Sequence, residues 1–181
     1  MNENKLRQSI LIFDYASKVL EKISQDGFLE LEKQAVFDRK NRVSATEFKT
    51  TISFTDIENS NHQIAESTKK FLQIIPQALF VSFQTELTLK LLIYQKNNQE
   101  ERGHDLSHLF NQLNDSIKNN LIKSITEKLN ISEDQFNKFL TTNSRIFEKW
   151  RYHHEPADIY HLDMKFLKPF YEELYTKIEK S

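Results

Sequence analysis

The sequence predicts an all-α protein, an antiparallel bundle of five to seven helices. Only two glycines and three prolines occur in 181 residues, which leaves few turn residues for a β-sandwich or barrel. Charged residues make up 28% of the chain and hydrophobic residues 38%, a balance typical of long amphipathic helices. Apolar residues also recur at three- and four-residue spacings along most of the chain. We expect one domain over residues 1–181.

The first helix is predicted near the N-terminus. Its apolar residues fall on one helical face, and they are Leu6, Ile10, Phe13, Val19, Leu20 and Ile23. Gly27 is a typical C-terminal stop, so the helix is expected to end there. The periodicity then weakens, and Phe48, Ile52 and Phe54 alternate with polar residues. This pattern predicts a small extended or hairpin insert at about residues 28–57.

The central helix is predicted after Pro76. A helix is expected from Asn61 to Ile75, and Pro76 fits either the first turn of a new helix or a kink. The segment QALFVSFQTELTLKLLIYQK is apolar around most of its circumference. It is therefore expected to lie at the centre of the bundle, covered on several sides.

Further helices are predicted in the second half of the chain. One contains the apolar positions Leu106 to Ile117, with His104 or Asp105 as its cap. Another follows the capping box that begins at Ser132 and is expected to end near Glu155, before a proline. A last helix is expected over residues 159–178.

The composition excludes several classes of function. The absence of cysteine excludes disulfides, thiolate zinc sites and cysteine nucleophiles. Two glycines cannot build a phosphate-binding loop, and no nucleotide-binding fingerprint is present. A net charge of −1 argues against a broad nucleic-acid surface but leaves room for a local basic patch. Neither a secretory signal nor a membrane span is predicted, so we expect a cytoplasmic protein.

Two ionisable residues fall on the predicted core face of the central helix. Glu86 and Lys90 lie four residues apart on the side of Leu79, Phe83 and Ile93. A lone charge in a protein interior costs several kcal/mol, so both groups need partners. One interpretation pairs them with each other at the edge of the bundle.

A second interpretation places the pair in a larger polar cluster. Its members come from three separate stretches and are Glu86, Lys90, His104, Asp105, Arg151 and Glu155. Such a cluster is either structural or the floor of a site, and the sequence leaves both possibilities open.

The histidines do not form a convincing metal site. His104 and His108 have the spacing of two ligands on a helix, and His154, Asp158 and His161 form a second set. The second set is interrupted by Pro156, which spoils a regular helix between the ligands. We expect neither a metal nor another cofactor.

Three strings of the sequence resemble the HEPN (higher eukaryotes and prokaryotes nucleotide-binding) superfamily in its bacterial members. They are SFQTELTLKLLIY, then GHDLSHLF, then FEKWRYHHE followed by a final helix, and together they extend from about Ala78 to Leu174. The resemblance implies a helical bundle that is frequently a homodimer. Many members are metal-independent ribonucleases in toxin-antitoxin, abortive-infection or CRISPR-linked defence.

The chain departs from the catalytic pattern of that family, in which a histidine follows an arginine after four to six residues. Seven residues separate Arg145 from His153, and His153 and His154 are too close to Arg151. What matches is the WRY string with Glu155. The resemblance therefore implies a HEPN-like binding or regulatory module of a bacterial defence or stress system.

A divergent endoribonuclease or toxin is the alternative, with Arg151 and His154 as its catalytic residues. The expected partners are a second copy, RNA or a nucleotide, or a cognate antitoxin or nucleotidyltransferase. Residues for RNA contact are Arg145, Lys149, Tyr152 and His153, with Trp150 and Tyr160 as further stacking surfaces. The basic ones among them also fit a solvated stripe, and a structural subunit of a larger assembly is a third interpretation.

Overall fold

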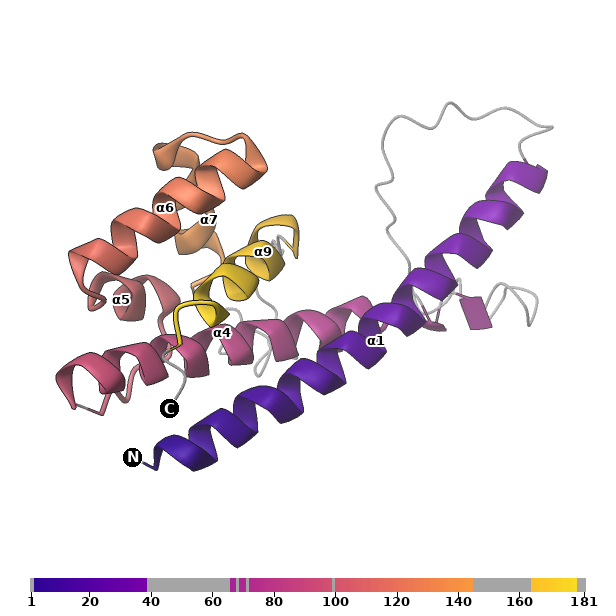
Figure 1. The fold of residues 1–181 in the computed structure, drawn as a ribbon. Coiled ribbons are helices and arrows are strands. Elements are labelled where there is room, and N and C mark those ends of the chain that lie inside the picture. Colours follow the sequence, from indigo (N-terminus) through magenta and orange to yellow (C-terminus); the bar gives the residue numbers. More distant parts are fainter. Residues whose placement is uncertain are drawn as a thin grey trace, which may run out of the picture. The chain divides into compact units, whose positions relative to one another are not determined.

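A computed structural model of the chain describes residues 2–38, 66–67, 69–70, 72–98, 100–144 and 164–178. These residues contain six helices and no strand, which confirms the predicted all-α class (Figure 1). Two compact units are present, one formed by Met1–Ser17 with Ala78–Ser181 and the other by Lys18–Gln77. We call the first the large unit and the second the small unit.

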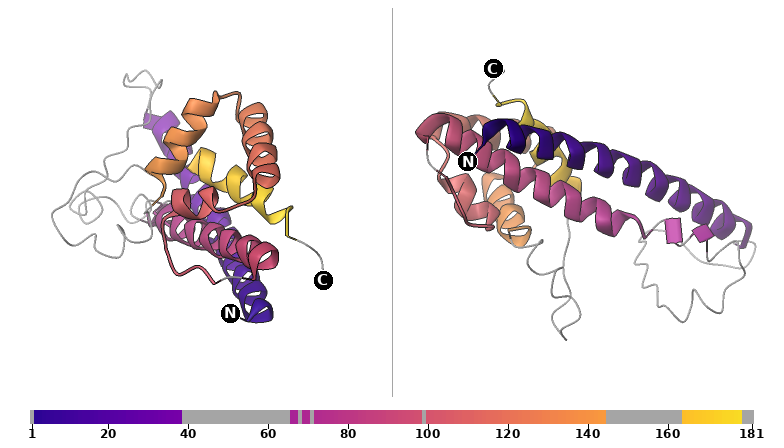
Figure 2. Two further views of the ribbon diagram at one scale, coloured as in Figure 1. Left: turned by 90° about the vertical axis from the view of Figure 1, so that its left-hand side faces the viewer. Right: turned by 90° about the horizontal axis from the view of Figure 1, so that it is seen from below.

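The helices are α1 (Glu3–Asp38), α4 (Ile74–Asn97), α5 (Leu106–Asn111), α6 (Asp115–Leu129), α7 (Glu133–Thr142) and α9 (Met164–Tyr175). In the large unit, α5, α6, α7 and α9 lie together beside α4 in all three views (Figures 1 and 2). None of the helices in these described ranges has the length and apolar character that crossing a membrane requires.

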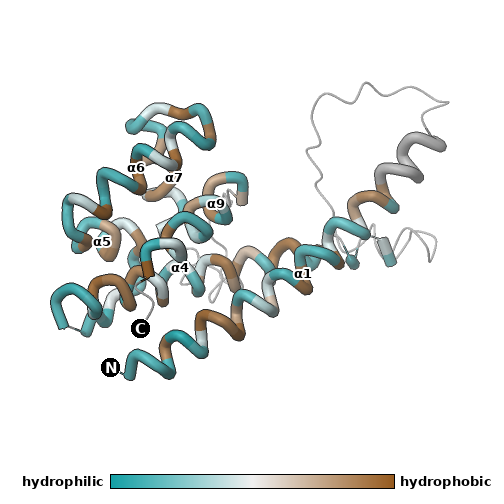
Figure 3. Tube along the Cα trace, viewed as in Figure 1, coloured by the Kyte–Doolittle hydropathy of each residue, from teal (hydrophilic) through white to brown (hydrophobic). Residues whose placement is uncertain are grey.

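Helix α4 is the buried centre of the large unit, as its sequence predicts. Leu89, Leu91 and Ile93 are at most 1% exposed, and Leu91 lies on the opposite side of the helix from the other two. The hydropathy of α4 is accordingly high along much of its length (Figure 3). Pro76 lies in the first turn, where its missing amide breaks no helical hydrogen bond.

A cluster of phenylalanines joins α5, α7 and α9. The ring of Phe136 lies 5.5 Å from that of Phe110, 5.4 Å from Phe166 and 5.8 Å from Phe170, measured between centroids. All four side chains are buried. Edge-to-face and tilted pairs of this kind stabilise a core by about 0.5–1.5 kcal/mol each beyond the burial of their area.

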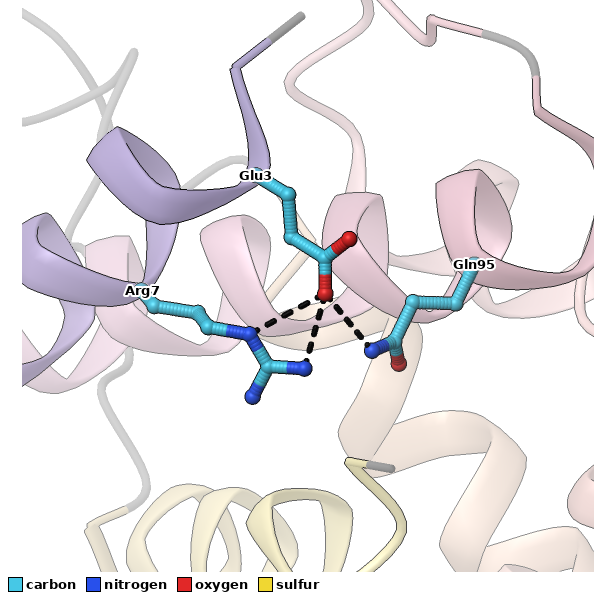
Figure 4. A network of polar contacts seen from close by, with 3 residues as sticks. All are labelled: Glu3, Arg7 and Gln95. Carbon is cyan, nitrogen blue, oxygen red and sulfur yellow. Dashed lines mark hydrogen bonds and ion pairs between the residues drawn. The ribbon is translucent and has the colours of Figure 1, made fainter. Parts of the chain in front are cut away.

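The N-terminal turn of α1 is joined to the last turns of α4 by one carboxylate (Figure 4). Oε1 of Glu3 accepts hydrogen bonds from Nε and Nη2 of Arg7, at 3.0 and 2.7 Å, and from Nε2 of Gln95 at 3.0 Å. The bonds from Arg7, and then the one from Gln95, lower the pKa of Glu3. This contact fixes the start of α1 in the large unit.

The predicted end of the first helix at Gly27 is wrong, because α1 continues to Asp38. A glycine inside a helix costs only about 1 kcal/mol relative to alanine. Gly27 is buried, and the residues after it are mostly good helix formers. Residues 28–38 are therefore helical and not part of an insert. The remainder of the predicted insert lies outside the described residues.

Two other helix boundaries differ from the prediction. The pattern from Leu106 to Ile117 predicts one helix, but the structure has two, because α5 ends at Asn111 and α6 starts after Asn114. The side chain of Asn114 caps α6 by accepting a hydrogen bond from the amide of Ile117 at 2.8 Å. Helix α7 ends at Thr142 instead of near Glu155.

Side-chain competition explains the early end of α7. The amide Nδ2 of Asn143 donates to the carbonyl of Phe139 at 2.7 Å, and the amide N–H of Ser144 donates to the carbonyl of Thr141 at 3.1 Å. These bonds satisfy the last turn locally and end the helix. The capping box at Ser132 and Gln135 is confirmed, with both of its hydrogen bonds present.

Candidate functional site

The candidate site of the large unit is a buried ionic cluster on α4. Oε1 of Glu86 accepts a hydrogen bond from Nζ of Lys90 at 2.8 Å and lies 3.0 Å from Nδ1 of His104. Glu86 is 2% exposed and Lys90 is also buried. The two groups lie one helical turn apart, which is the spacing that lets glutamate and lysine side chains meet.

His104 connects this cluster to solvent. Its side chain is 48% exposed, although its Nδ1 contacts a carboxylate that is almost sealed. Because a carboxylate only accepts, Nδ1 carries the proton in this contact. The neutral imidazole then presents Nε2 as an acceptor, and the imidazolium presents a second donor. A buried acid that orients an imidazole in this way is the arrangement found in general-base pairs.

Asp105 follows His104 in the chain, and its described hydrogen bonds cap a helix. Its Oδ1 accepts from the amide of His108 at 3.0 Å, so Asp105 is the N-cap of α5. The same oxygen accepts a short hydrogen bond from the hydroxyl of Ser144. This residue therefore shapes the start of α5, and its described contacts do not include Glu86.

Ser144 is the residue near the site that the sequence does not reveal. Its Oγ accepts from the amide of Ser107 at 2.9 Å, and its carbonyl accepts from the amide of Leu106 at 3.0 Å. It thus satisfies two of the orphan N–H groups in the first turn of α5. The sequence gives no signal for this role, because the helix predicted after Ser132 is expected to run past Ser144 to near Glu155.

His108 faces its own helix and the preceding loop. Its Nε2 lies 2.8 Å from Nε2 of Gln112, one turn further along. A Cβ atom at Gly103 would lie 3.8 Å from Cδ2 of His108, so the ring is in ordinary van der Waals range of the loop. Within the described part of the chain, no three acidic or histidine side chains are grouped as metal ligands.

The structure thus brings together Glu86, Lys90 and His104, and the contacts described for Asp105 are those with His108 and Ser144. The remaining predicted residues fall in 145–163, outside the described ranges. They comprise the proposed catalytic pair Arg151 and His154, the cluster residue Glu155, and the RNA-contact residues Arg145, Lys149, Tyr152 and His153.

Comparisons of the chain with protein-family models, with curated proteins and with solved structures found no match. Any function must therefore be argued from the chemistry of the cluster and from the strings of the sequence around it.

Proposed function

We propose that the chain is a HEPN-like binding or regulatory module of a bacterial defence or stress system, of the toxin-antitoxin or abortive-infection type. It would act in the cytoplasm as a homodimer and bind RNA, a nucleotide or a cognate protein. The proposal rests on the resemblance of the strings around Glu86, His104 and Trp150 and on the absence of the catalytic arginine-histidine spacing.

One observation favours a module over an enzyme. The carboxylate of Glu86 contacts both Lys90 and His104 through a single oxygen, and it is almost completely buried. Charges that compensate each other in this way hold segments of a fold together, here α4 and the loop before α5. Lys90 is correspondingly occupied by Glu86 and is not presented to a ligand.

Another observation keeps the nuclease in consideration as a second candidate. His104 is half-exposed and oriented by a buried acid, as a base that activates a ribose 2′-hydroxyl needs to be. In that case Arg151 would stabilise the charge that develops on phosphorus, and His154 would be the alternative base. A metal-free mechanism of this kind continues in EDTA.

The experiment uses the single tryptophan of the chain, Trp150. Its fluorescence is titrated with single-stranded RNA and with nucleotides in EDTA, and the RNA is then analysed on a denaturing gel. The module predicts a saturable change in fluorescence with intact RNA, weakened by Arg151→Ala. An exposed lysine far away in the sequence provides the control variant Lys5→Ala, which should bind as the wild type does.

Cleavage would decide between the two candidates. If RNA is cleaved and His104→Gln or Arg151→Ala stops it, the nuclease replaces the module. Expression should then be toxic to the host and become harmless in the same variants. If the fluorescence changes with neither RNA nor nucleotide and the RNA stays intact, nucleic-acid binding is refuted.

A further inference from the structure

The small unit exposes an apolar row on α1 that the proposed function does not use. Val19 is 41% exposed, Ile23 37% and Leu29 50%. Ser24 and Gly27 are buried, so they mark the packed side of the same helix. Exposed apolar side chains grouped along one helix face, with charged residues among them, are typical of an interaction surface.

A cavity of about 270 Å³ opens on this face. It is lined by Ile23, Asp26, Leu29, Glu30 and Lys70. The cavity therefore has apolar walls and two carboxylates against one ammonium.

The ammonium in the cavity is already engaged. Nζ of Lys70 donates to Oε1 of Glu30 at 2.7 Å, and Ser67 donates to Oε2 of the same carboxylate at 2.9 Å. The pKa of Lys70 is raised, chiefly by its bond to Glu30 and further by the charges of Asp26 and Glu66. Among the described lining residues the carboxylates outnumber the ammonium, which suits the side chain of another lysine, whose stem would cover the apolar wall.

The same helix offers such a lysine. Lys22 is exposed and lies one turn before Asp26, on the face that carries the cavity. When two α1 helices pair antiparallel about a two-fold axis beside Ser24, residues equally far before and after Ser24 lie opposite each other. Lys22 of each copy then lies opposite Asp26 of the other, and the exposed Val19 of each copy lies opposite Leu29 of the other. A parallel pair would instead place Lys22 opposite Lys22.

We propose that this face binds a second copy of the chain in antiparallel orientation, with Lys22 of each copy entering the acidic cavity of the other. The contact is isologous, so one patch serves both partners. This surface would form the homodimer of the proposed function. The inference rests on the proposed function only for the existence of a dimer, and the surface is argued from α1 itself. Because one helix per copy buries a small area, the dimer is expected to dissociate in the micromolar range or above.

Exchanging the charges of Lys22 and Asp26 tests the proposed antiparallel pairing of the two α1 helices. Sedimentation equilibrium of the full chain at low salt gives the dissociation constant. Lys22→Glu and Asp26→Lys should each weaken the dimer about tenfold, because each removes both symmetric pairs. The double variant Lys22→Glu, Asp26→Lys restores opposite charges in the reversed sense and should return to within about threefold of the wild type. Lys5→Glu makes the same charge change elsewhere on α1 and should have no effect.

The possible outcomes distinguish two questions: whether the chain dimerises, and whether it dimerises through this face of α1. A wild-type dimer that none of these variants weakens would lie on another face, which overturns the proposal and leaves the homodimer in place. Weakening by both single variants without restoration in the double variant would refute the antiparallel pairing. A chain that remains monomeric up to about 1 mM would refute both. Asp26→Asn, which preserves shape, replaces Asp26→Lys if circular dichroism shows that the latter is unfolded.

Discussion

Removing Lys90 should destabilise the protein strongly, although removing Lys90 together with Glu86 should not. At 2.8 Å and an effective dielectric constant of about 20, the two charges attract each other by about 6 kcal/mol. The desolvation of two ions, at several kcal/mol each, offsets most of this gain. The pair thus contributes little net stability, but either partner alone is costly.

The expected values follow from this balance. Lys90→Met leaves a buried carboxylate with His104 as its only described donor and should lower the free energy of unfolding by about 3–5 kcal/mol, as should Glu86→Leu. The double variant should lie within about 1 kcal/mol of the wild type. The double-mutant cycle then gives a coupling energy of about 5 kcal/mol or more in magnitude. Urea unfolding followed by far-UV circular dichroism measures each value.

A matched control exists on α9 and the residues that follow it. Glu173 and Lys177 have the same order and spacing, with an N–O distance of 2.7 Å, but they are only partly buried. The same cycle there should give about 0.3–0.5 kcal/mol. If the Glu86 and Lys90 substitutions were additive and cost no more than this control pair, the cluster would behave as a solvated pair and the case for a buried ionic site would fail.

Two further predictions concern the packing of the core and the dependence of the free energy of unfolding on acidic pH. Phe136→Ala removes a ring that contacts three other phenylalanines and should cost about 3–5 kcal/mol in the same urea assay; a cost below about 1 kcal/mol would show that the cluster repacks freely. The bond from Lys177 lowers the pKa of Glu173 below its ordinary 4.5, so its contribution is complete above pH 4.5 and is lost as the pH falls through the lower folded-state value. The stability gap between the wild type and Glu173→Gln should therefore close on acidification, and a gap that widened below pH 4.5 would contradict this sign.

Local signals in the sequence were sufficient for the elements that depend on neighbouring residues. The capping box at Ser132 and Gln135 is a contact between residues three apart, and the burial of α4 follows from its apolar circumference. The meeting of Glu86 with Lys90 likewise needs only one helical turn. These features could be predicted because no tertiary contact has to be known in advance.

The features that the sequence did not reveal depend on distant contacts or on competing local ones. Whether Gly27 ends a helix or packs inside it is decided by what lies against it, and periodicity does not contain that information. The role of Ser144 arises because it lies against the start of α5, 37 residues earlier in the chain. Asn114 and Asn143 had visible signals, since asparagine favours caps, but the apolar spacing around them suggested continuous helices.

The ionic cluster also helps to explain why α4 takes one rotational orientation about its own axis. A helix that is apolar on all sides gains nearly the same burial after rotation about its axis, so its register needs another determinant. Rotation of α4 by one residue would turn Glu86 by about 100° away from His104, so the carboxylate would keep Lys90 and lose its contact with the imidazole. Lys90 would turn with it and could not replace the lost donor from the loop. The contact with His104 therefore favours one orientation of α4, in which Glu86 faces the segment that leads into α5.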